Sequence, residues 1–191
     1  MPVDLIAFTA DRRIRGSIPL ADDRLSDMLN SVPRIVVRGA VLEDLVVADR
    51  TETGDVTLAV GAIVAVLVAG GRGVATRRRK TDLHRARIGL TRFVVSGWLH
   101  VPLGGSDRLA SSDPGVVLAG RDVLVPLTDA TISYDKAEQP TTERFETILV
   151  NRAHATWIDL DDAAGGDDSD LVAGRRVVYH AAMVKDFTRA T

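Results

Sequence analysis

Apolar and polar residues alternate over short stretches along most of the chain, which is the period of half-buried β-strands. In the first part this pattern predicts strands over residues 3–9 and 13–20, joined by a turn at Ala10-Asp11. Further strands are expected over 35–37 and 41–47, on either side of Gly39, where a bulge or sharp bend is expected. The stretch 56–68 is predicted to form two strands that are broken near Gly61-Ala62, after a loop over 51–55.

A short helical turn is predicted over residues 25–30, because Leu25, Met28 and Leu29 recur at spacings of three and four. Asn30 is expected to end the turn in a left-handed conformation.

The second part of the chain has the same character, with short strands separated by Gly, Pro and Asp. Strands are expected over 94–102, 116–118, 123–127, 130–134 and 147–160. A final strand is expected over 175–185, where a helix is the alternative because Ala181-Ala182-Met183 would tolerate one. The predicted fold class is mostly β, as a small barrel or a sandwich.

The chain also looks duplicated. Gly16 precedes Gly39 by 23 residues, and Gly97 precedes Gly120 by the same 23, so an offset of 81 superimposes both glycines. The same offset matches the apolar triplet 35–37 with 116–118. Val60 and Ala65 match Val150 and Ala155 at an offset of 90, which predicts about nine extra residues in the second copy near 137–144.

These patterns predict two homologous β halves, at 1–69 and 85–160, joined by a basic linker at 70–84. Residues 161–191 are expected to add an acidic loop and a C-terminal strand. Two small cores packed on each other would bury strand faces that a single small barrel leaves marginal.

Charge is segregated along the chain, although the net charge is only −2. The linker is basic and the loop after residue 160 is rich in aspartate, so both are candidate interaction segments. The candidate interaction residues are Arg72, Arg77, Arg78, Arg79, Lys80, Asp161, Asp162, Asp167, Asp168 and Asp170. The basic run could bind the acidic loop, in the same chain or a neighbouring copy, or nucleic acid, or remain solvated.

One segment superficially resembles a membrane span. Residues 56–70 are almost wholly apolar and precede the basic run, but they are shorter than the roughly 20 residues a helix needs to cross hydrocarbon. The N-terminus also lacks the pattern of a secretory signal, so a cytoplasmic location is expected.

A family resemblance rests on three short motifs. These are the strand, Gly, strand and Pro pattern of each half, the run Asp-Arg-Leu-Ser-Asp at 23–27 with Leu29-Asn30, and Leu149-Val150-Asn151-Arg152 leading to Trp157-Ile158. Together they resemble small all-β domains of uncharacterised bacterial proteins and, distantly, Sm-type or SH3-like barrels. The resemblance implies no activity and no site residue.

No catalytic, cofactor or metal signature is evident in the sequence. Cysteine is absent, and the histidines His84, His100, His154 and His180 lack the paired spacing that aims two ligands at one metal. Gly71-Arg72-Gly73 follows an apolar strand as a phosphate-binding turn would, but the Gly-Lys-Ser/Thr of a P-loop is missing. We therefore expect a non-enzymatic interaction or assembly module that self-associates and needs no cofactor. The alternative is a small-molecule or nucleotide-sensing domain, with its ligand between the halves near Gly71-Arg72-Gly73, or a weak nucleic-acid binder that uses the linker.

Overall fold

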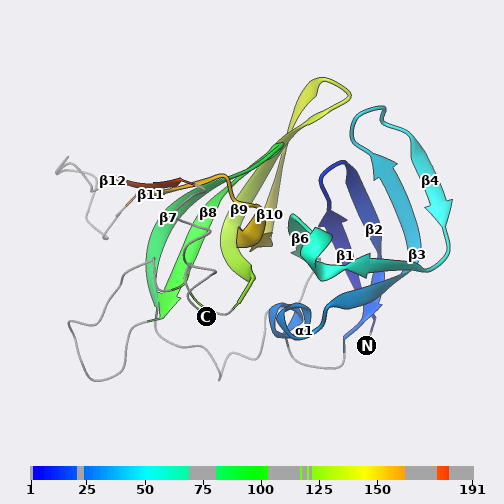
Figure 1. Cartoon of the computed structure of the whole chain (residues 1–191), viewed down its shortest axis with the longest axis horizontal. Helices are drawn as coiled ribbons and strands as arrows, with labels where there is room; N and C mark the ends of the chain where they lie inside the picture. Colours follow the sequence, from blue (N-terminus) through cyan, green and yellow to red (C-terminus); the bar gives the residue numbers. More distant parts are fainter. Residues whose placement is uncertain are drawn as a thin grey trace.

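The computed structural model describes residues 2–20, 24–68, 81–102, 117, 120, 122–161 and 176–180. Within them, twelve strands form one antiparallel sheet, joined by helix α1 and the 3-10 turns η1 and η3 (Figure 1). The elements of the first part are β1 (Pro2–Phe8), β2 (Arg12–Pro19), α1 (Leu25–Ser31), β3 (Arg34–Asp44), β4 (Arg50–Thr53), β5 (Val56–Ala59), η1 (Val60–Ala62) and β6 (Ala65–Val68). Those of the second part are β7 (Thr81–Leu90), β8 (Phe93–Pro102), β9 (Leu124–Lys136), β10 (Gln139–Asn151), η3 (Arg152–His154), β11 (Trp157–Asp161) and β12 (Arg176–His180).

The predicted β class is confirmed, but two separate barrels are not. The strands follow one path, β12-β11-β7-β8-β9-β10-β6-β1-β2-β3-β4, and β5 pairs with β3 beside that path. The second part joins the first where β10 pairs with β6, so the sheet runs without interruption from β12 to β4 (Figure 1).

The two parts of the sheet have the same pairing order. β1 lies between β2 and β6, and β7 lies between β8 and β11; β2 then pairs with β3, as β8 pairs with β9. The register shifts beside Gly16 in one part and beside Gly97 in the other. A Cβ on Gly16 would lie 2.6 Å from Cγ1 of Val37, and one on Gly97 would lie 2.8 Å from Cβ of Ala130, so both bulges need glycine.

The structure corrects the predicted alignment after these bulges. Arg38 of β3 pairs with Ser17, and Thr128 of β9 pairs with Trp98, the counterpart of Ser17. Corresponding residues of β3 and β9 are therefore 90 positions apart in the sequence. Gly39, with φ 56°, therefore corresponds to Asp129, with φ 47°, and not to Gly120. The extra residues fall between β8 and β9, whereas the predicted insertion over 137–144 instead forms the β9–β10 hairpin.

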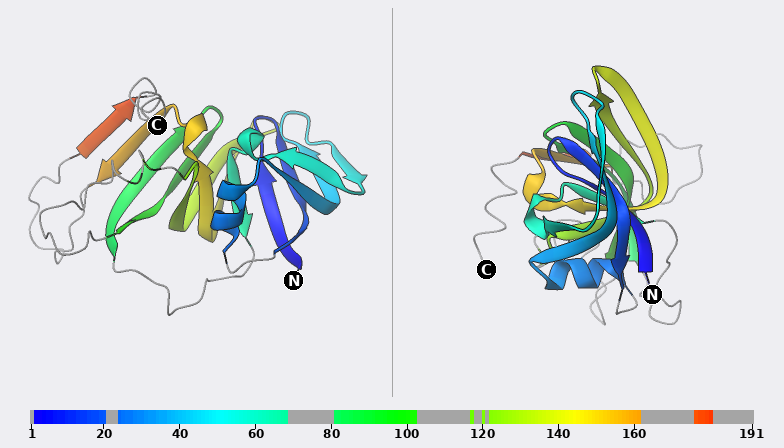
Figure 2. Two further views of the ribbon diagram at one scale, coloured as in Figure 1. Left: turned by 60° about the horizontal axis from the view of Figure 1, so that its bottom comes forward. Right: turned by 90° about the vertical axis from the view of Figure 1, so that its right-hand side faces the viewer.

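The final strand of each part follows a 3-10 turn. Leu67 of β6 pairs with Ile6 of β1, and Asp159 of β11 pairs with Arg87 of β7. Corresponding residues of β6 and β11 are therefore 92 positions apart in the sequence, instead of the predicted 90. The turns η1 and η3 lie side by side, where His154 Nε2 is 2.8 Å from the Gly61 carbonyl oxygen (Figure 2).

Two hydrophobic clusters lie on opposite faces of the strands at the junction. In β6, Ala65 and Leu67 belong to the cluster of the second part, and Val66 belongs to that of the first. In β10, Ile148 and Val150 join the second cluster while Leu149 joins the first. The junction strands are therefore buried on both sides, as a consecutive apolar run requires.

Several local predictions differ from the structure. Residues 51–53 form part of β4 instead of a loop, because their Thr-rich sequence pairs with β3 at an exposed edge. β7 begins at Thr81, so 81–84 belong to a strand rather than to the predicted linker, and Val117 is helical where a strand was predicted. The predicted helix forms as α1, but it continues to Ser31 with an extended Val32 as its C-cap, so Asn30 does not end it.

Candidate interaction site

The structure places few of the sequence-predicted interaction residues. Arg72, Arg77, Arg78, Arg79, Lys80, Asp162, Asp167, Asp168 and Asp170 lie outside the described residues, as do the glycines of Gly71-Arg72-Gly73. Asp161 is the last residue of β11, where the strand register places it between Arg85 of β7 and Arg176 of β12. The proposed contact between the basic run and the acidic loop therefore stays a prediction.

The two ends of the sheet differ in character. At one end, β4 has the sequence Arg-Thr-Glu-Thr, and its charged residues blunt an edge against further pairing. At the other end, β12 carries Val177-Val178-Tyr179 between Arg176 and His180. β-Branched and aromatic residues favour strand pairing. Among the described strands β12 pairs only with β11, so its outer edge has no partner there.

The junction between the two parts contains a partly buried polar network that sequence reasoning missed. Nη2 of Arg13 donates to Oε2 of Glu143 at 2.8 Å, and Nζ of Lys136 lies 2.5 Å from Oε1 of Glu43. The hydroxyl of Tyr134 donates to the other oxygen of Glu143 at 2.5 Å. Strands β2, β3, β9 and β10 are thus tied together by charge-assisted hydrogen bonds.

These contacts shift the pKa values of the network. Burial raises the pKa of Glu43, but the hydrogen bond and charge of Lys136 and the charge of Arg13 outweigh it, so the net pKa lies below its usual value. Burial and the Glu143 carboxylate raise the pKa of Tyr134 well above its usual value. The network is therefore ionised at Glu43 and protonated at Tyr134 near neutral pH.

An aromatic cluster lies beneath this network. The rings of Phe8, Phe93 and Tyr134 lie with centroids 5.3–5.7 Å apart, and the guanidinium of Arg13 lies 5.6 Å from the centroid of Phe8. These residues come from β1, β2, β8 and β9, so the cluster also joins the two parts of the sheet.

Two asparagines make further links across the junction. Asn30 of α1 donates through Nδ2 to the Leu124 carbonyl at 3.2 Å and accepts from the Leu124 amide at 2.9 Å. Buried Asn151 donates to the Ile63 carbonyl at 2.8 Å and accepts from the Ala153 amide. Both asparagines satisfy backbone groups of the opposite part, which a sequence pattern does not reveal.

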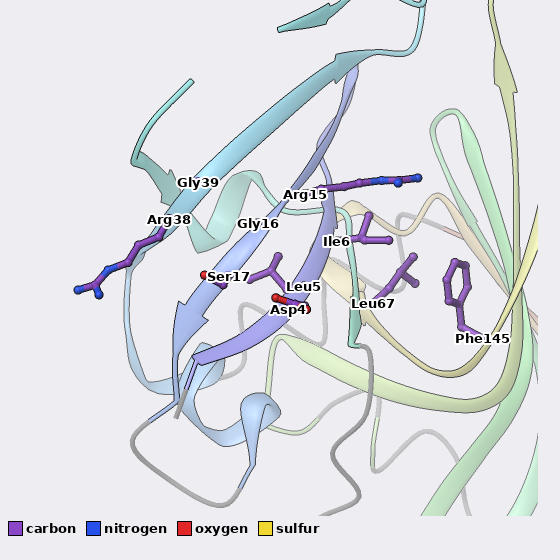
Figure 3. A pocket seen from close by; sticks show the side chains of 10 residues that line it. All are labelled: Asp4, Leu5, Ile6, Arg15, Gly16, Ser17, Arg38, Gly39, Leu67 and Phe145. Carbon is purple, nitrogen blue, oxygen red and sulfur yellow. The ribbon is translucent and has the colours of Figure 1, made fainter. Parts of the chain in front are cut away.

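An open cavity of about 450 Å³ lies near the same junction. Its lining residues are Asp4, Leu5, Ile6, Arg15, Gly16, Ser17, Arg38, Gly39, Leu67 and Phe145. Figure 3 shows Ile6, Leu67 and Phe145 facing one another, with Arg15 extending above them, while Arg38 points away. The site thus combines an apolar floor with Arg15 on its rim and Asp4 in its lining, in the size range of small-molecule pockets.

The outer face of the second part holds both tryptophans of the chain. The guanidinium of Arg85 lies 5.6 Å from the ring centroid of Trp98, and that of Arg87 lies 5.6 Å from the centroid of Trp157. Asp159 stands opposite Arg87 in the strand register. Each tryptophan is thus engaged by an arginine of its own chain, which weakens this face as a base-stacking surface for nucleic acid.

No group of three or more histidine, aspartate or glutamate residues is arranged to hold a metal within the described part of the chain. Of the predicted histidines, His100 lies between Thr81 and Thr128, with its ring nitrogens 3.2 Å and 2.7 Å from their hydroxyl oxygens. Burial lowers the pKa of His100.

No protein-family model, curated protein or solved structure matches the chain. None of the helices in the described ranges is long and apolar enough to cross a membrane, and the described part of the apolar stretch from residue 56 forms β5, η1 and β6.

Proposed function

We propose that this protein is a non-enzymatic interaction module that self-associates through the end of its sheet formed by β11 and β12. The observation that supports this function is the open sheet, whose β12 end carries the β-prone run Val177-Val178-Tyr179 on an edge without a described partner. The opposite end carries the charged strand β4, which makes it the weaker surface for strand pairing.

We further propose that the two parts of the sheet arose by duplication of one five-stranded unit. The shared pairing order, the paired bulges at Gly16 and Gly97 and the two 3-10 turns support this origin. In each unit the last strand pairs with the first, which is the pairing that closes a meander into a small barrel. This order also supports the resemblance to Sm-type and SH3-like barrels.

Sedimentation velocity over a range of protein concentrations tests the proposed self-association. We expect the mass-average sedimentation coefficient to rise with concentration, and the Val178→Pro variant to lose this rise because proline cannot complete a strand ladder. Thr51→Pro, at the other end of the sheet, is the matched control and should behave like the parent protein. A parent chain that is monomeric throughout, or a Val178→Pro variant that associates normally, would contradict the proposal.

A second candidate function is binding of a small organic anion in the cavity. Arg15 on the rim would pair with the anionic group, and Ile6, Leu67 and Phe145 would cover the apolar part of the ligand. The ligand position expected near Gly71-Arg72-Gly73 lies outside the described residues and stays a prediction.

Thermal-shift measurements with nucleotides and other organic anions test this candidate. A true ligand at about 100 times its Kd should stabilise the folded state by about 2.7 kcal/mol. Arg15→Gln should abolish the shift, whereas Arg12→Gln, on the same strand but outside the cavity, should not. Equal shifts in both variants would place the ligand elsewhere.

A further inference from the structure

The edge of β11 in the second part corresponds to the edge of β6 in the first. At the edge of β6, the β10 residues Ile148, Leu149 and Val150 stand opposite Leu67, Val66 and Ala65. At the edge of β11, the β12 residues Val178, Tyr179 and His180 stand opposite Asp159, Ile158 and Trp157. With the offset of 92, both triplets occupy the same places in the same antiparallel direction, so β12 fills the position that β10 fills on β6.

The two filling strands are attached differently. β10 forms a long hairpin with β9, from Leu124 opposite Asn151 to Lys136 opposite Gln139. β12 pairs only with β11 among the described strands, and its connection to β11 runs through residues 162–175. Fully extended, that connection of about 14 residues would span about 45 Å. Such a length allows β12 to reach the β11 edge of another molecule.

We propose that β11 is a strand-acceptor edge and that two copies of the chain exchange β12 across it, which gives a dimer with twofold symmetry. This inference rests on the proposed self-association at this end of the sheet, and it assigns that association to exchange of β12 instead of pairing at the outer edge of β12. Each copy keeps the β11–β12 ladder that it has alone, so exchange costs little beyond the loss of translational freedom, which higher protein concentration offsets.

Another occupant of the β11 edge would be β5 of a second copy, because β5 corresponds to the part of β10 that docks on β6. The residues of β5 and of the neighbouring strand β3 disfavour such docking. Exposed Thr57 and Arg34 of the first part stand where the second part has Leu149 and Leu124, which are 4% and 0% exposed at the junction. Docking β5 would bury the Arg34 charge at the place where β9 buries Leu124.

Disulfide trapping tests the exchange, because the chain has no cysteine of its own. Asp159 and Val178 stand opposite each other in the β11–β12 ladder, where cross-strand Cβ atoms are close enough for a disulfide. We would prepare the full chain as Asp159→Cys, as Val178→Cys and as the double variant, and oxidise each alone and the two single variants mixed. The matched control is a mixture of Asp159→Cys with Val56→Cys, which probes β5 as the occupant.

We expect a covalent heterodimer from the mixture of Asp159→Cys and Val178→Cys and none from the mixture with Val56→Cys. The double variant should give an intramolecular disulfide at low concentration and doubly linked dimers at high concentration. A heterodimer with Val56→Cys alone would overturn the exchange in favour of β5. If the unmodified chain sediments as an oligomer but only intramolecular links form, the exchange is wrong and the proposed self-association stands. If the unmodified chain is also monomeric at every concentration, both fail.

Discussion

Arg13 and Glu143, 130 residues apart in the sequence, form a 2.8 Å ion pair between the two parts of the sheet. Only 7% of the Arg13 side chain is exposed, and its Nε has no hydrogen-bond partner among the described residues. The guanidinium thus depends on Glu143, since Glu43 lies farther away, at 3.9 Å.

Glu143→Gln should therefore destabilise the fold by about 2 kcal/mol, because a mostly buried guanidinium would lose its charged partner. Urea unfolding measures the loss. The control is Arg144→Gln, which removes an exposed pair with Asp129 and should cost less than about 0.5 kcal/mol. If the two variants lost equal free energy of unfolding, burial of Arg13 would contribute nothing to the strength of its ion pair.

Gly16→Ala and Gly97→Ala should each destabilise the protein by about 2 kcal/mol, because the added methyl group would overlap Val37 in one case and Ala130 in the other. Gly61→Ala is the control, since no atom lies within 4 Å of the position that its methyl group would take, and it should change stability by less than about 0.5 kcal/mol. Thermal unfolding of the three variants makes the comparison. Tolerance of alanine at either bulge would argue against the close approach of β2 to β3 or of β8 to β9.

The β9–β10 hairpin turns through Ala137 and Glu138, which both have positive φ, at 46° and 63°. Two-residue hairpins of this kind favour Asn-Gly, and a left-handed conformation costs other residues about 1 kcal/mol or more each. The double variant Ala137→Asn/Glu138→Gly should therefore raise the free energy of unfolding by about 1 kcal/mol. Chemical denaturation provides the test, and a decrease in stability would show that the native side chains make contacts that outweigh the strain.

The stability of the protein should depend on pH through His100. Burial lowers the pKa of His100 in the folded state, so its contribution is present above the unfolded pKa, near 6.5, and is lost as pH falls through that value toward the folded one. Unfolding at a series of pH values from 7 to 5 should show this loss. His100→Gln should flatten the profile in this range, and an unchanged profile would assign the effect to other groups.

The sequence predicted those parts of the fold that depend on neighbouring residues. The β1–β2 hairpin, the break at Gly61-Ala62 and the helical turn from Leu25 are local, and they form as expected. The sequence matches Gly39 with Gly120 because both are glycines. In the structure Gly39 corresponds to Asp129, since both have a positive φ. Aspartate can adopt this conformation, so the residue type did not mark the position. The Ala137-Glu138 turn was missed because it lacks the residues that usually mark such a hairpin.

The junction could not be predicted in the same way. The consecutive residues Ile148, Leu149 and Val150 indicate a strand buried on both faces, but they do not say which strand lies beside it. Arg13 and Glu143 are ordinary charged residues in strand patterns, and only the pairing of distant strands brings them together. The candidate basic and acidic segments were selected by charge alone, and the structure describes only Asp161 among them.

Because β6 and the end of β10 have no solvent face, their tolerance of substitution should differ from that of a strand with one solvent face, such as β8. In β8 the burial alternates from Phe93 to Val101, so polar residues fit at every second position. From Ala65 to Leu67 every side chain enters one hydrophobic cluster or the other, and a polar residue has no permitted position. A deep mutational scan would show this region as a continuous block of sensitive sites, in contrast to the alternating pattern of β8. The same three residues would also make the two parts unfold together, since neither cluster is complete without them.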